Sequence, residues 1–136
     1  MMRIALLVYQ ILIAISDSAT GILLLLAPAW TLGLMGVSAS QDTLVFLAWI
    51  GAFVFAIGLC CAYGVRLMLA RSCPGRIETV WLLTALVRAS VAIFVLQRVL
   101  NGTLDSGWLL VACADGSCAI VQGVGLKKGW LKHGAR

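Results

Sequence analysis

Four long apolar stretches, separated by short polar segments, constrain this chain more than any other feature of its sequence. They run over about residues 4–27, 44–65, 77–99 and 106–126. A helix needs about 20 mostly apolar residues to cross the hydrocarbon core of a bilayer. The sequence therefore predicts an all-α, polytopic membrane four-helix bundle that forms a single transmembrane domain over residues 1–136.

Composition argues against a soluble enzyme. Of the 136 residues, 62% are hydrophobic and 11% are charged, whereas a soluble domain carries about 45–50% apolar and about 25% charged residues. His133 is the one histidine, so the spans lack the imidazole that a histidine-ligated metal, a bis-histidine haem or a Ser-His-Asp triad requires. The five cysteines contain no C-x-x-C motif, which argues against a metal or redox site as their role. We expect no catalytic residue, no metal and no enzymatic activity.

The basic residues predict the orientation of the spans. Eight of the ten Lys and Arg residues flank the same side of the predicted bundle. They are Arg3, Arg66, Arg71, Arg76, Lys127, Lys128, Lys132 and Arg136. Basic loops stay in the cytoplasm, so both termini are expected there. The membrane is expected to be the inner membrane of a bacterium. The net charge of +5 is then a topology signal, and no nucleic-acid partner is expected, because no basic patch interleaved with aromatic residues lies outside these flanks.

Five tryptophans lie near the ends of the predicted spans. Trp30, Trp49 and Trp108 are near outer ends, and Trp81 and Trp130 are near inner ends. Tryptophan is enriched at both membrane–water interfaces. The positions therefore predict an aromatic belt at each interface.

Three charged residues interrupt the apolar spans near mid-depth. Asp17 lies in the first span, Arg88 in the third and Asp115 in the fourth. An ionised residue at the bilayer centre costs about 2.5–3.5 kcal/mol on insertion scales. We therefore expect the three side chains to face the bundle interior and to meet one another.

The spacing of the neighbouring residues favours such a cluster, because each charge lies on a stripe of small and polar residues repeated every three or four positions. The stripes are Gln10, Ala14, Asp17, Gly21 and Leu24; Glu78, Trp81, Ala85, Arg88 and Ala92; and Trp108, Ala112, Asp115, Ala119 and Gln122. The second span carries Ala48, Gly51, Ala52, Ala56 and Gly58 without a charge. Small residues let helix backbones approach closely in lipid, so the second span is expected to be a packing helix.

Two interpretations of the charged cluster compete. In the first, Arg88 holds the two carboxylates as a planar fork and fixes the register of the helices. In the second, one arginine against two aspartates leaves one carboxyl group that tends to stay protonated, which suits proton coupling or the binding of a cationic or polar ligand. Further polar side chains are expected to support the site: Gln10, Thr20, Thr84 and Gln122. No cofactor is predicted, although a quinone or a lipid near Arg88 is a third alternative.

Two segments outside the spans carry further expectations. Residues 28–42 form the longest outer loop and begin with an apolar stretch that includes Trp30, Leu32 and Leu34. This stretch suits a short interfacial helix, a partner contact, or a segment folded over its own bundle. Residues 127–136 form a basic cytoplasmic tail, for which contact with anionic lipid headgroups is expected.

The chain resembles the DoxX-like small four-helix membrane proteins of bacteria. The resemblance rests on Leu26-Ala27-Pro28, on the turn Gly33-Leu34-Met35-Gly36, and on the glycine-spaced second span from Trp49-Ile50-Gly51 to Gly58. Some DoxX-like proteins are associated with quinone-linked oxidoreductase complexes, so the resemblance implies an accessory subunit. The size of the chain and the acid in its first span are also similar to the small multidrug-resistance transporters, but Arg88 and the one-sided basic bias depart from that family.

These observations predict a non-enzymatic accessory or structural subunit of a larger inner-membrane complex, in contact with membrane lipids and with other membrane-protein subunits. The Asp-Arg-Asp cluster would fix its bundle. The alternative is a small proton- or cation-coupled transporter that acts as an oligomer, with Asp17 and Asp115 as the titrating groups.

Overall fold

The regular structure of the chain is helical throughout the described residues. The computed structural model describes residues 2–70 and 73–133. In these ranges it contains α1 (Met2–Leu26), α2 (Pro28–Leu34), α3 (Gln41–Leu69), α4 (Pro74–Leu100), a 3₁₀ turn η1 (Ser106–Trp108), α5 (Leu109–Lys127) and α6 (Trp130–His133). Four segments are long and apolar enough to cross a membrane: α1, α3, α4, and η1 with α5. The predicted all-α architecture with four candidate spans is confirmed.

The helix ends follow local backbone chemistry. Pro28 and Pro74 occupy the first turns of α2 and α4, where the missing N–H of proline costs no intrahelical hydrogen bond. The helix α4 therefore begins before the predicted residue 77, and Arg76 is helical rather than part of a loop. Arg71 lies outside the described residues, as does Arg136.

The apolar start of the predicted outer loop folds as the short helix α2. Thr31 and Leu32 are buried, whereas Trp30 and Leu34 are exposed. Gly36 ends this turn at a φ of 69°, a backbone conformation that glycine adopts without steric cost. The expectation of a short helix in this loop is confirmed, and its placement at a membrane interface remains a prediction.

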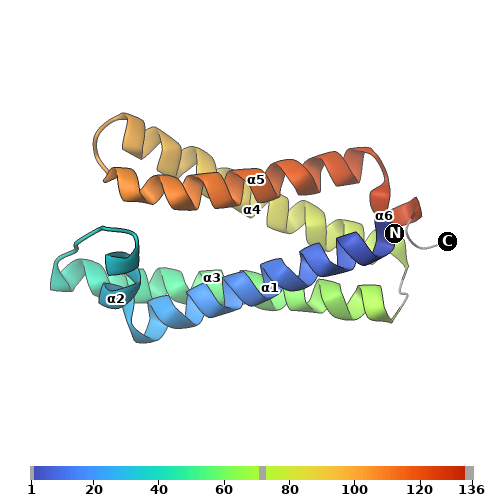
Figure 1. Cartoon of the computed structure of the whole chain (residues 1–136), viewed down its shortest axis with the longest axis horizontal. Coiled ribbons are helices and arrows are strands. Elements are labelled where there is room, and N and C mark those ends of the chain that lie inside the picture. Colours follow the sequence, from blue (N-terminus) through green and yellow to red (C-terminus); the bar gives the residue numbers. More distant parts are fainter. Residues whose placement is uncertain (1, 71–72, 134–136) are drawn as a thin grey trace. The chain divides into compact units, whose positions relative to one another are not determined.

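The chain forms two compact units, each built on an antiparallel pair of helices. The N-terminal hairpin spans Leu6–Arg66, and the C-terminal hairpin comprises Leu67–Arg136 with the first residues of the chain, Met1–Ala5. Figure 1 shows α1 beside α3 in the first pair and α4 beside α5 in the second.

Glycines bring α1 and α3 of the N-terminal hairpin into backbone contact. A Cβ atom added at Gly58 would lie 2.6 Å from the backbone nitrogen of Ser18, and one at Gly51 would lie 2.9 Å from that of Leu25. A Cβ at Gly21 would overlap the backbone of Phe55. The two helices therefore pack at a distance that no larger residue permits at these positions.

The predicted packing faces of the N-terminal hairpin agree in part with the structure. On α1, the stripe residues Gln10, Ala14, Gly21 and Leu24 are buried, and Asp17 is half-buried. On α3, the glycines lie in the contact, but Ala52 and Ala56 are exposed. The small residues of α3 thus divide between a face that meets α1 and a face turned outward.

The C-terminal hairpin packs side chains rather than backbones. Trp81 of α4 is completely buried, and its ring lies so close to Gly125 of α5 that an added Cβ would be 2.5 Å from Cζ3. The prediction that Trp81 belongs to an interfacial belt is therefore wrong. Its position near the end of a span indicates depth only, whereas its place on the Arg88 stripe turns it toward α5.

A glycine-to-alanine pair tests the close contact of α1 with α3. Gly58→Ala should lower the free energy of unfolding by about 1–3 kcal/mol, because the new methyl group must push Ser18 and its helix away. The matched control is Gly123→Ala on α5, where nothing lies within 4 Å of the added Cβ. Titration with sodium dodecyl sulfate, followed by circular dichroism, measures both values. Equal stability of the two variants would contradict the contact.

Candidate functional site

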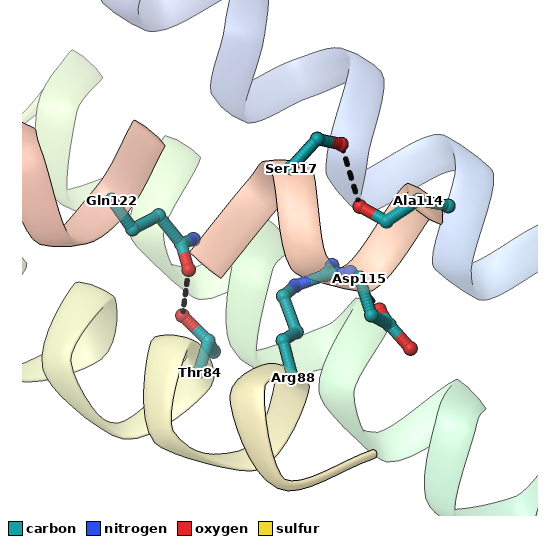
Figure 2. A network of polar contacts seen from close by, with 6 residues as sticks. All are labelled: Thr84, Arg88, Ala114, Asp115, Ser117 and Gln122. Carbon is teal, nitrogen blue, oxygen red and sulfur yellow. Dashed lines mark hydrogen bonds and ion pairs between the residues drawn. The ribbon is translucent and has the colours of Figure 1, made fainter. Parts of the chain in front are cut away.

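An ion pair joins the middle of the two long helices of the C-terminal hairpin. Nη1 of Arg88, on α4, lies 2.7 Å from Oδ1 of Asp115, on α5. Both side chains point into the space between the helices (Figure 2). The exposed fraction is 6% for the Arg88 side chain and 21% for that of Asp115. This is a short, charge-assisted hydrogen bond between two groups that are largely removed from solvent.

The helical stripes explain why these two residues meet. Trp81, Thr84, Arg88 and Ala92 form the buried face of α4, and Ala112 and Gln122 are buried on α5. Asp115 lies three residues after Ala112 and seven residues before Gln122, and this spacing places all three on one side of the helix. The antiparallel register then sets Arg88 opposite Asp115, just as it sets Trp81 opposite Gly125.

The contact between Arg88 and Asp115 uses one oxygen of the carboxylate. Only Oδ1 accepts from the guanidinium in the described hydrogen bond, and Oδ2 points away from Nη1 (Figure 2). Oδ2 of Asp115 thus retains acceptor capacity beyond the bond that joins α4 to α5.

A second polar contact lies beside the ion pair on the same seam. Thr84 Oγ1 is 2.8 Å from the carbonyl oxygen of Val80 and 3.4 Å from Oε1 of Gln122 (Figure 2). The hydroxyl has one proton, and the shorter distance assigns it to Val80. Gln122 is completely buried, and its Nε2 has no acceptor among the described residues. With the amide turned over, Nε2 would donate to Thr84 Oγ1 while that hydroxyl donates to the carbonyl oxygen of Val80.

The other supporting residues lie in the N-terminal hairpin. Gln10 is completely buried, and its Nε2 donates to the carbonyl oxygen of Cys61 at 2.9 Å, which ties α1 to α3. Thr20 is exposed and lies off the buried face of α1. Asp17 is half-buried on α1, in a different unit from Arg88 and Asp115, and its membership of the charged cluster remains a prediction.

Sequence reasoning missed two partners in these contacts. Gly125 accommodates the Trp81 ring, and the signal for it was present, because Gly125 lies three residues beyond Gln122, where the predicted stripe ended. The carbonyl oxygen of Cys61 has no signal in the sequence, because every residue carries such a group. The thiol of Cys61 is buried, and none of the five cysteines, all of which lie within the described residues, forms a disulfide.

Comparison with protein-family models, curated proteins and solved structures finds no match to this chain. The chemistry of the site therefore rests on the residues described above.

A double-mutant cycle tests the ion pair. Arg88→Met and Asp115→Leu should each lower the free energy of unfolding by about 3 kcal/mol, because each leaves a charge buried without its partner. The double variant Arg88→Met/Asp115→Leu should lose less than either single variant, because it removes both charges. Unfolding in sodium dodecyl sulfate measures all three values.

The control for this cycle is Glu78→Gln. Glu78 Oε1 lies 3.6 Å from Lys132 Nζ, and the lysine side chain is 67% exposed. An exposed pair contributes about 0–1 kcal/mol, so this change should be nearly neutral. A double variant that is less stable than both single variants would show that Arg88 and Asp115 do not act as a pair.

Proposed function

We propose that this chain is a non-enzymatic accessory subunit of a larger assembly in the inner membrane of a bacterium. The observation that carries the proposal is that buried polar side chains form bonds between neighbouring helices. The Arg88–Asp115 bond joins α4 to α5, and the Gln10 bond joins α1 to α3. Polar groups that connect helices stabilise a scaffold, since transmembrane helices associate through such bonds and through close packing.

The outer surface supports the same proposal. Large apolar side chains are exposed along all four candidate spans, for example Leu12, Phe46, Leu86 and Leu110. Exposed apolar surface on this scale requires lipid or another apolar protein surface around it. The resemblance to DoxX-like proteins suggests that a quinone-linked oxidoreductase complex supplies this apolar protein surface.

The proposed orientation places both termini in the cytoplasm. Arg76 at the start of α4 and Lys127 and Lys128 at the end of α5 lie at the same end of the antiparallel C-terminal hairpin. Arg98 is at the opposite end of α4. The excess of basic residues at one end supports a cytoplasmic location for that end.

Native mass spectrometry of complexes released directly from membranes tests the accessory role. We expect the chain in a heteromeric complex with other membrane proteins, at a fixed ratio that survives mild detergent, because its exposed helical faces are then subunit contacts. Recovery solely as a monomer or as an oligomer of itself would contradict the proposal.

The runner-up function is a small proton- or cation-coupled carrier. Asp115 favours it, because its side chain is more exposed than that of Arg88 and one of its oxygens points away from the guanidinium (Figure 2). A half-open carboxyl group inside a span is a default candidate for proton transfer.

Proton flux into liposomes decides between the two functions. If the chain is a carrier, Asp17→Asn and Asp115→Asn should each reduce proton uptake, followed with an enclosed pH-sensitive dye, to the rate of protein-free liposomes. The matched control Asp105→Asn changes an exposed acid at the end of the hairpin and should leave the flux unaltered. An accessory subunit predicts no flux above that of empty liposomes for the unmodified chain.

A further inference from the structure

The last residues of the described chain fold back onto the C-terminal hairpin. Gly129 reverses the backbone with a φ of 63°, and α6 follows at once. Leu131 is buried, with 6% of its surface exposed, and the Trp130 ring lies against Gly125, where an added Cβ would be 2.9 Å from Cε3. The short helix is therefore anchored to α5 by apolar contacts.

This fold-back gathers positive charge at one end of the hairpin. Arg76, Lys127, Lys128 and Lys132 are exposed there. Among the described residues, Glu78 is the acid at this end, and its Oε1 lies 3.6 Å from Lys132 Nζ. The four cations and the one carboxylate sum to a net charge of +3, and we name these five residues the basic end.

The surroundings of the basic end indicate what it meets. Its cations lie where the apolar helix α4, of 27 residues, begins and the apolar helix α5, of 19 residues, ends. The half-buried Trp130 lies beside them in the chain. In membrane proteins, tryptophan rings and basic side chains lie at the level of the lipid headgroups. A basic segment next to the cytoplasmic leaflet attracts its anionic lipids.

We infer that the basic end, held in place by α6, binds the headgroups of anionic phospholipids. The ligand is a phosphodiester with a net negative charge, such as phosphatidylglycerol. Because Lys127 and Lys128 end α5 and Lys132 lies on the docked α6, the three lysines lose less conformational entropy on binding than they would in a free tail. The inference rests on the membrane location in the proposed function, but it does not depend on the accessory role.

Competition between two lipids tests the inference on the isolated chain. The protein is purified in an uncharged maltoside detergent and mixed with equal amounts of phosphatidylglycerol and phosphatidylcholine that carry the same acyl chains. Native mass spectrometry measures the ratio of the two lipids bound. We expect phosphatidylglycerol to be enriched at low salt and the enrichment to fall as salt rises, because the screening length shortens from about 30 Å at 0.01 M to about 8 Å at 0.15 M.

Two variants separate the cations from their arrangement. The double variant Lys127→Gln/Lys128→Gln removes two of the four cations and keeps Arg76, Lys132 and Glu78. It should lower the enrichment of phosphatidylglycerol at least about fivefold, since one cation near an anionic leaflet contributes about a fivefold gain in binding. Leu131→Ser keeps every charge but removes the buried anchor of α6, and it should also lower the enrichment. The control Arg98→Gln removes a cation from the opposite end of α4 and should leave the ratio unchanged.

The outcomes distinguish the parts of the inference. A ratio of one for the unmodified chain would overturn it, as would full competition by free inorganic phosphate, which would show a site for the ion rather than for the lipid. Unchanged enrichment in Leu131→Ser would overturn the role of α6. If no partner chain is found in membranes but the enrichment is seen, the accessory role fails and the lipid site stands.

Discussion

Apolar helices surrounded by lipid gain little by burying leucine against leucine, because the lipid tails are equally apolar. The helices of this chain must therefore associate through close packing or through polar bonds, and its two hairpins combine the two means in different proportions. In the N-terminal hairpin, Gly51 and Gly58 bring α3 against the backbone of α1. In the C-terminal hairpin, Arg88 binds Asp115 and Trp81 fills the space beside Gly125.

The two solutions respond differently to their surroundings. A contact between glycine and backbone depends on shape alone, and pH or salt leaves it unaltered. In a medium of low dielectric, each charge of an ion pair offsets the cost of burying the other, and the loss of one charge leaves that cost uncompensated. The C-terminal hairpin thus holds an ion pair that a proton or a charged ligand can address. Both proposed functions use it, the accessory role as a link between α4 and α5 and the carrier through Asp115.

Much of this arrangement could be predicted from local patterns. The spacing of Gln10, Ala14, Gly21 and Leu24 identifies the buried face of α1, and the cost of a lone charge within an apolar span predicts that Arg88 and Asp115 meet. The assignment of Trp81 to an interface failed, because distance from the end of a span gives the depth of a residue and not the direction of its side chain. The contact of Lys132 with Glu78 depends on the reversal at Gly129, which no pattern in the apolar spans indicates.

The sequence by itself determined how many apolar helices form, where they approximately begin and end, and which face of each is polar. These properties depend on hydrophobic length, proline positions and helical period, all of which are local to a segment. Only the tertiary structure decided which residue stands opposite which: Ser18 against Gly58, Arg88 against Asp115, Trp81 against Gly125. Register between antiparallel helices is set by contacts between residues far apart in the chain, and many registers satisfy the same periodic pattern until the shapes and charges of both helices are brought together.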